Sequence, residues 1–228
     1  MYTLVVVGAG GTGSYFLKEF ARYIHHTQKQ KEFKKMVIFD GDSVEQKNLM
    51  RQSFIKEDIG RNKAVVMAEA LNDNFDLKFE SYACYLNNKN QLEDVVEGIP
   101  LIISCVDNHG CRLLLEDFFH SYNHCIYFDS ANEFENGEVV YSYKKDGKVY
   151  GPVRSFYFPN ILKDDVRTRE EMSCEELNNV EPQHIFTNML AGNLLCTGVS
   201  NLLEKKVTPG FAYFNSHTYS SSFIAYCG

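Results

Sequence analysis

The feature that most constrains the fold is a glycine cluster near the start of the chain. Residues 8–13 read Gly-Ala-Gly-Gly-Thr-Gly, directly after an apolar, β-branched run at residues 3–7. Apolar residues then recur at helical spacing up to residue 24, so the order is strand, glycine turn, helix. Such a turn lets the backbone approach a phosphate closely, and the start of the helix supplies unpaired N–H groups and a positive dipole end. We therefore predict a nucleotide site here; a tight turn without a ligand is the alternative.

The same alternation continues to about residue 130. Strands are predicted at residues 36–40, 77–83, 101–106 and 126–129, and helices between them around residues 64–71, 92–96 and 113–119. A repeating order of strand and helix predicts an α/β fold: a Rossmann-like, mostly parallel sheet with helices on both faces. In that fold the first candidate function is a nicotinamide-dependent oxidoreductase, with Asp40 on the ribose hydroxyls.

After residue 130 the pattern changes. We predict antiparallel strands at 138–143 and 150–158 joined by a turn at 145–148, a mobile crossover loop at about 160–183, a C-terminal helix at 184–203, and strands at 210–214 and 222–226. The 228 residues are expected to form one domain, with a nucleotide-binding core at 1–130 and an antiparallel extension at 131–228.

Composition excludes several classes of function. The net charge is −7, and the longest basic stretch lies at residues 29–35, so nucleic acid is not an expected partner. No apolar run approaches the roughly 18 residues that span a bilayer, and the sequence as given begins without a secretory signal, so we expect a cytoplasmic protein. The seven cysteines form no Cys-x-x-Cys pair, which favours reduced thiols and no structural zinc.

Polar side chains follow two of the predicted strands. The segment 39–52 reads Phe-Asp-Gly-Asp-Ser-Val-Glu-Gln-Lys-Asn-Leu-Met-Arg-Gln, and Lys63 follows it. Cationic and amide groups at the carboxyl edge of a parallel sheet can neutralise a triphosphate, although a solvated polar loop has the same composition. Asp107, just after the strand at 101–106, is placed to bind Mg²⁺ or to cap the next helix, and both can hold.

Four motifs together carry a specific resemblance. They are Gly8-x-Gly-Gly-x-Gly13, Asp40-x-Asp-x-Val-x-x-x-Asn-Leu-x-Arg-Gln52, Gly60-x-x-Lys63 and Asp107-Asn-x-x-x-Arg112. In order and spacing, over about residues 3–145, they resemble the ThiF-type adenylyltransferases, the bacterial relatives of ubiquitin-activating enzymes. The later layout, with Ser-Cys-Glu-Glu at 173–176 and a long helix after it, is similar to ThiF-like proteins of plasmids and other mobile elements.

The resemblance implies a set of roles. Phosphates would lie on Gly8, Gly10, Gly11 and Gly13, the ribose on Asp40, the triphosphate on Asn48, Arg51, Gln52 and Lys63, and Mg²⁺ on Asp107, with Asp42 and Asn108 completing the ATP site. The family activates the C-terminal glycine carboxylate of a ubiquitin-like or sulfur-carrier protein and releases pyrophosphate. Because that carboxylate is already ionised, alignment and charge neutralisation suffice and no general base is required. The family usually works as dimers, so a homodimer or heterodimer is expected, with the carrier on the late strands and the last helix.

Cys174 is the candidate for a covalent step. In many relatives a cysteine accepts the activated acyl group as a thioester or takes part in sulfur transfer. Cys174 lies in the polar stretch and should be exposed, whereas the other six cysteines fall mostly in apolar elements. The surrounding Glu170, Glu171, Glu175 and Glu176 are expected to raise its pKa. A cysteine at a helix start, without chemistry, is the alternative.

One departure from the family pattern bears on function. Many relatives carry an N-terminal helix whose arginine reaches the ATP of a partner subunit, and the given sequence has no such arginine before its first strand. A second protein could supply the charge, Arg51 and Lys63 could suffice, or one of four other arginines could substitute: Arg22, Arg61, Arg112 and Arg154. A non-catalytic ThiF-like pseudoenzyme subunit is the remaining alternative, and the oxidoreductase hypothesis leaves residues 48–52 unexplained.

Overall fold

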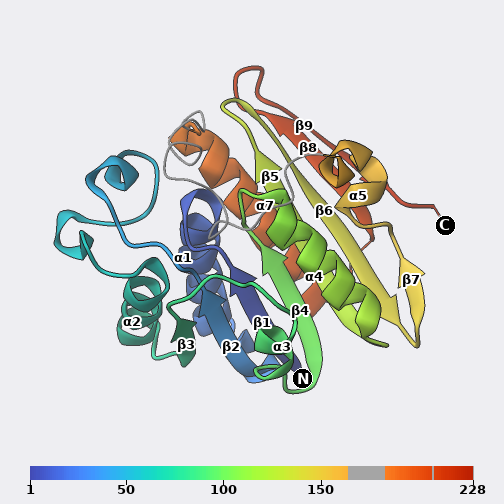
Figure 1. The fold of residues 1–228 in the computed structure, drawn as a ribbon, viewed down its shortest axis with the longest axis horizontal. Coiled ribbons are helices and arrows are strands. Elements are labelled where there is room, and N and C mark those ends of the chain that lie inside the picture. The colour runs from blue at the N-terminus through green and yellow to red at the C-terminus, as the bar shows by residue number, and fades with distance from the viewer. Residues whose placement is uncertain (164–182, 207, 228) are drawn as a thin grey trace.

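A mixed β-sheet runs through the molecule (Figure 1). The computed structural model describes residues 1–163, 183–206 and 208–227. Within them the sheet has nine strands in the order β3-β2-β1-β4-β5-β6-β8-β9, with β7 paired to β6. The predicted α/β class, with parallel strands followed by antiparallel ones, is confirmed.

The first five strands are parallel. They are β1 (Tyr2–Val7), β2 (Phe33–Phe39), β3 (Phe79–Tyr82), β4 (Ile99–Ser104) and β5 (Cys125–Asn132). β1 lies at the centre, with Val5 opposite Val37 on one side and Ile102 on the other. Strands covered on both faces need apolar side chains at successive positions, which is why residues 4–7 and 101–103 are uninterrupted apolar runs.

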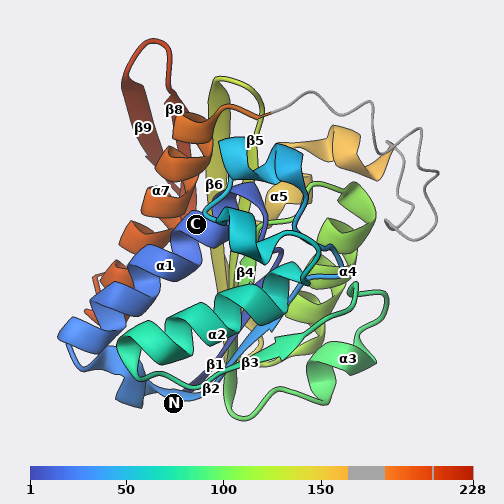
Figure 2. The same cartoon turned by 90° about the vertical axis from the view of Figure 1, so that its left-hand side faces the viewer.

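Helices cover both faces of this sheet, as predicted. One face carries α1 (Gly11–His26), α2 (Lys63–Phe75) and α7 (Ile185–Leu203), and the other carries α3 (Asn90–Glu93) and α4 (His109–Ser121) (Figure 2). Alternation along each strand separates the two cores: Leu4 and Val6 pack with the first group, Val5 and Val7 with the second. Among the described residues, no helix is long and apolar enough to cross a membrane.

The remaining strands extend the sheet in antiparallel fashion. They are β6 (Asn136–Lys145), β7 (Lys148–Tyr150), β8 (Gly210–Asn215) and β9 (Ser220–Ala225). The β6–β7 hairpin turns through Asp146 and Gly147, both at positive φ (51° and 75°), which is the two-residue turn that suits the twist of a hairpin.

The predicted strand at 150–158 is wrong. β7 ends at Tyr150, and the chain then turns at Gly151, which has φ of 75°, and Pro152, which has no N–H to donate to a ladder. A short helix follows, α5 (Arg154–Tyr157). Short 3-10 turns complete the structure: η1 (Lys29–Glu32), η2 (Gln46–Met50), η3 (Lys56–Asp58) and η4 (Pro159–Leu162). Most of the predicted crossover loop lies outside the described residues.

Candidate functional site

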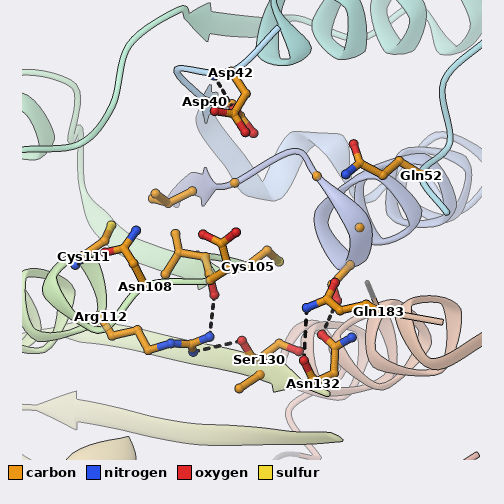
Figure 3. A pocket seen from close by; sticks show the side chains of 18 of the residues that line it. Asp40, Asp42, Gln52, Cys105, Asn108, Cys111, Arg112, Ser130, Asn132 and Gln183 are labelled. Carbon is orange, nitrogen blue, oxygen red and sulfur yellow. Dashed lines mark hydrogen bonds between the residues drawn. The ribbon is translucent and has the colours of Figure 1, made fainter. Parts of the chain in front are cut away.

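A cleft of about 1400 Å³ opens at the carboxyl ends of β1, β2, β4 and β5. It lies where the strand order reverses, with β2 on one side of β1 and β4 on the other, the point at which open α/β sheets bind ligands. All the predicted nucleotide-site residues line it except Gly13: Gly8, Gly10, Gly11, Asp40, Asp42, Asn48, Arg51, Gln52, Lys63, Asp107 and Asn108. Figure 3 shows part of this cleft from close by.

The glycines between β1 and α1 differ in what they do. Gly8 has φ of 92°, and a Cβ there would lie 2.6 Å from the Cys105 carbonyl oxygen. A Cβ on Gly13 would lie 1.9 Å from the Gly8 carbonyl oxygen, so Gly13 lets α1 pack on the turn and does not face the cleft. A Cβ on Gly10 would meet only Gln52 Nε2, at 3.6 Å, so packing within the protein does not require a glycine there. Close approach of a ligand would account for it.

The start of α1 can receive an anion. Gly10 is its N-cap residue, and no side chain in the described part of the chain caps the helix. The first N–H groups of an uncapped helix need acceptors, and the helix dipole favours a negative group at this end. Since Gly10 and Gly11 line the cleft, this end of α1 borders it.

Asp40 connects the end of β2 to the glycine turn. Its Oδ2 accepts a hydrogen bond from the Ala9 N–H at 2.7 Å, and its Oδ1 accepts one from the Asp42 N–H at 2.8 Å. Burial raises the pKa of Asp40, while the charge of Lys63 and these two bonds oppose the rise. Each oxygen keeps a further lone pair, so Asp40 can accept from a ligand hydroxyl while it holds the turn.

The buried Lys63 and the half-buried Asp42 form an ion pair beside the cleft. Lys63 begins α2, whose start is capped by the Asn62 side chain. Its Nζ lies 2.9 Å from Asp42 Oδ2, and the Tyr85 hydroxyl donates to Asp42 Oδ1 at 2.5 Å. The positive charge of Lys63 is therefore largely balanced within the protein before any ligand arrives.

The loop after Asp42 brings two groups to the cleft. The Gln52 side chain is buried, and its Oε1 has no hydrogen-bond partner among the described residues. Arg51 is half-buried at the cleft, and within the described chain no side chain pairs with its guanidinium. Asn48 is committed locally, because its Oδ1 accepts from the Glu45 N–H at 2.8 Å. A charged donor and an unsatisfied buried amide are typical of a polar ligand site.

Asp107 and Asn108 follow β4 with different tasks. Asn108 caps α4, since its Oδ1 accepts from the Cys111 N–H at 2.7 Å. Asp107 is exposed at the cleft, and the structure assigns the capping role to its neighbour. One carboxylate beside a phosphate site is an arrangement that Mg²⁺ uses, with phosphate and water oxygens as its other ligands.

A buried ionic cluster joins β5, β6, α4 and α5 next to the cleft. Arg112 Nη1 lies 2.6 Å from Asp129 Oδ1, Arg154 Nε pairs with Asp129 Oδ2, and Arg154 Nη1 lies 2.6 Å from Glu138 Oε1. Burial raises the pKa of Asp129, but the two arginines outweigh it and the net pKa is lowered. Figure 3 shows Arg112 pointing toward Ser130, whose carbonyl oxygen accepts from Nη1 at 3.0 Å.

None of the four substitute arginines named above is available to a ligand as a lone charge. Arg112 and Arg154 belong to the buried cluster. Arg22 pairs with Glu19 and Arg61 with Glu69, both on the surface and away from the lining of the cleft. Of the arginines that the structure describes, Arg51 is therefore the one best placed to contact an anion in the cleft.

Three amide side chains that the sequence analysis did not select lie at the α1 side of the cleft: Asn132, Gln183 and Asn188. Figure 3 shows Asn132 beside Gln183. Asn188 is fully buried in α7 on the same face as Ala191, Leu195 and Val199. A polar residue on the inward face of an apolar helix is a signal that the sequence did contain.

Four of the six cysteines other than Cys174 pack in apolar surroundings, which agrees with the prediction that most of them do. Cys84 and Cys227 are exposed, so exposure does not single out Cys174. Cys105, Cys111, Cys125 and Cys196 agree with the expectation of cysteines packed in apolar elements, and burial raises the pKa of each. Cys174 lies outside the described residues, and its role stays a prediction.

The fold and the cleft define an α/β protein of the Rossmann-like class, with a glycine turn at the switch point of a parallel sheet. A model of the ThiF family matches residues 2–224, and the chain belongs to that family. The predicted family resemblance is confirmed.

Known relatives share part of this chain. The ubiquitin-like modifier-activating enzyme 5 of Dictyostelium discoideum is 30% identical over 122 residues, which is 48% of this chain and 30% of that enzyme. The enzyme of the same name from Aedes aegypti is 30% identical over 148 residues, 59% of this chain and 33% of the enzyme. The chain thus spans about a third of the length of these curated relatives.

Solved structures match nearly the whole chain. E. coli MccB with ATP superposes with a TM-score of 0.69 at 17% identity, covering 98% of this chain and 63% of MccB. PaaA superposes with a TM-score of 0.66 at 14% identity, covering 99% of this chain and 64% of PaaA. At these identities the likeness shows the fold alone.

Proposed function

We propose that the chain is a cytoplasmic, ATP-dependent adenylyltransferase. It binds Mg·ATP in the cleft and activates the C-terminal glycine carboxylate of a ubiquitin-like or sulfur-carrier protein, with release of pyrophosphate. The observation that carries the proposal is that the uncapped start of α1, the Arg51 guanidinium and the Asp107 carboxylate border one cleft. In this proposal they serve as an anion site, a positive charge and a magnesium ligand, which are the groups that transfer at a phosphate requires.

The residues present fit a nucleotide. Gly10 leaves room for close approach, Asp40 can accept from ribose hydroxyls, and the buried Gln52 Oε1 lacks a partner among the described residues. Asp107 would hold Mg²⁺, which when bound neutralises phosphate charge. Because Lys63 is paired with Asp42, Arg51 would be the main source of unpaired positive charge at the phosphates among the described residues.

The carrier carboxylate would enter from the β5–β6 side. The cleft continues past Ser130 and Asn132 to Phe134 and Phe158, so an extended tail lying there would reach the glycine turn. Exposed apolar side chains on late elements offer a surface for the body of the carrier or for a second subunit: Phe186, Met189, Leu190, Tyr213, Phe223 and Ile224. The names of the curated relatives, and a structure of MccB with AMPCPP and MccA, support a protein or peptide substrate. The proposal also includes a dimeric enzyme.

Ligand-dependent melting tests the proposal without the carrier. Mg·ATP at about 100 times its Kd should stabilise the protein by about 2.7 kcal/mol, which is visible as a rise in Tm. We expect that rise to require Mg²⁺ and to shrink in Asp107→Ala, an exposed position whose loss should leave the fold intact. A rise with NAD(H) or NADP(H) and none with ATP would replace this proposal with the oxidoreductase. An Mg·ATP rise without ATP–pyrophosphate exchange in the presence of any carrier would favour the pseudoenzyme.

A further inference from the structure

Asn188 is a buried polar residue of α7 that contacts residues lining the cleft without lining it itself. It is 0% exposed and is not among the residues that line the cleft. Its Oδ1 accepts from Asn132 Nδ2 at 2.8 Å, and its Nδ2 donates to the Arg51 carbonyl oxygen at 3.2 Å. A Cβ on Gly11 would lie 2.6 Å from this carboxamide, so Asn188 also packs directly on the glycine turn.

Asn132 extends the same hydrogen-bonded chain to the start of α1. Its Oδ1 accepts from Thr12 Oγ1 at 2.9 Å, and its carbonyl oxygen accepts from Gln183 Nε2 at 3.0 Å (Figure 3). The chain Thr12–Asn132–Asn188–Arg51 thus joins α1, β5, α7 and the loop after η2. Buried amides that satisfy one another in this way fix the relative positions of the segments that carry them.

The main chain around Arg51 is held by several hydrogen bonds, and Ser53 N–H also donates to Ser14 Oγ of α1, at 3.0 Å. The contact with Asn188 is the one that holds Arg51 itself to a distant segment among the described residues. The Arg51 N–H donates to the Asn48 carbonyl oxygen at 3.1 Å, a bond within its own loop. Its carbonyl oxygen is held by Asn188, across 137 residues of sequence. Since no side chain of the described residues holds the guanidinium, the location of the main chain decides where that charge lies.

We propose that Asn188 is a positioning residue of the nucleotide site. From outside the cleft it holds the Arg51 main chain at a set distance from the glycine turn, so that the guanidinium meets the outer phosphates of ATP. The inference rests on the proposed function, in which Arg51 contacts those phosphates. A misplaced charged group weakens transfer and binding even when every ligand-contacting residue is still present.

Two nucleotides distinguish positioning from general damage. In Asn188→Ala, the Kd for Mg·ATP should rise about tenfold, whereas the Kd for AMP, which has no outer phosphates, should change less than about twofold. Isothermal titration calorimetry measures both. Thr187→Val is the matched control: Thr187 is equally buried, adjacent in α7, and donates to the Phe134 carbonyl oxygen at 2.6 Å, so its loss should leave both Kd values within about twofold.

A double-mutant cycle shows whether Asn188 acts through Arg51. If it does, Asn188→Ala has no further effect on Mg·ATP affinity in an Arg51→Ala background. Equal losses for Mg·ATP and AMP, or losses that add in the double variant, would overturn the positioning role while the proposed function stands. Wild-type protein that binds neither nucleotide would overturn the proposed function itself. Asn188→Ser keeps a polar group at the site and takes the place of the alanine variant if that variant does not fold.

Discussion

Arg51 carries the clearest prediction at the scale of single residues. Its side chain is half-buried at the cleft and belongs to no ion pair of the described residues, so Arg51→Ala should leave Tm nearly unchanged. If the guanidinium stabilises charge that develops at the phosphates, its loss should lower ATP–pyrophosphate exchange by a factor on the order of 10²–10³. Exchange is measured with a carrier protein once one is known.

The control for Arg51 lies in the same loop. Lys47 also lines the cleft but is exposed and paired with Glu45, 2.9 Å away. Lys47→Ala should reduce exchange less than about threefold, because exposed charges act weakly through solvent. Unchanged exchange in Arg51→Ala would remove Arg51 from the proposed site.

Glu116 predicts a pH dependence of stability. It is buried in α4, its Oε1 accepts from the Ser155 N–H at 2.9 Å, and burial raises its pKa against the opposing effect of that bond. The folded state therefore binds this proton more tightly than the unfolded chain does. Stability from this group is present below about pH 4.3, the pKa of an unfolded glutamate, and is lost as pH rises through the raised value.

Glu116→Gln tests that sign. Glutamine keeps an acceptor for Ser155 and cannot ionise. The stability of the variant relative to wild type should therefore be higher at pH 7.5 than at pH 4. Urea unfolding at both values measures the difference. A relative loss on raising the pH would mean that Glu116 is stabilised as a carboxylate in the folded state.

At the scale of elements, the turn between β1 and α1 separates structural from ligand-facing glycines. Gly13→Ala places a Cβ 1.9 Å from a backbone oxygen, and should destabilise the fold by about 3 kcal/mol or more. In Gly10→Ala the new Cβ would lie 3.6 Å from Gln52 Nε2, which is an ordinary van der Waals contact. This substitution should cost no more than about 1 kcal/mol of stability. Its effect should fall on Mg·ATP affinity instead.

The two alanine variants are compared by thermal melting with and without Mg·ATP. We expect Gly13→Ala to melt at a markedly lower temperature, and Gly10→Ala to melt near wild type but with a smaller ATP-dependent rise. Full retention of the ATP-dependent rise in Gly10→Ala would indicate that the phosphates do not lie on this turn.

At the scale of the whole molecule, the open edge of the sheet predicts self-association. β9 is the last strand, all six of its residues are exposed, and residues 218–226 contain no charge and no proline (Figure 1). Edge strands that stay unpaired in solution usually carry a charged residue or a proline. Sedimentation velocity should show a mass that rises with protein concentration.

A lysine on the edge should oppose this association. Ile224→Lys is expected to weaken it roughly tenfold with little change in Tm, because Ile224 is already exposed. Phe156→Lys, at an exposed aromatic of α5, should leave it unaltered. Equal behaviour of the two variants would place the subunit contact away from β9.

Much of the fold could be predicted because its signals are local. The turn at residues 8–13, the apolar runs of β1 and β4 and the helical spacing of α1 each lie within one stretch of chain, and parallel strands bring their carboxyl ends to one edge whatever the loops do. The location of the cleft followed from these features, and eleven of the twelve residues predicted for the nucleotide site line it. The predicted strand at 150–158 is wrong because Gly151, at positive φ, and Pro152, which has no N–H to donate, end β7 before the apolar residues that follow.

Only the tertiary structure decided which polar side chains form ion pairs and hydrogen bonds with one another. Lys63 meets Asp42 at 2.9 Å across 21 positions, and Asn188 meets the Arg51 carbonyl at 3.2 Å across 137. The residue type shows that a charged group or an amide is present. It does not show whether that group already has an ion-pair or hydrogen-bond partner within the folded protein. That depends on contacts between distant segments, which decide which polar groups in the cleft the protein has satisfied and which it leaves for a ligand.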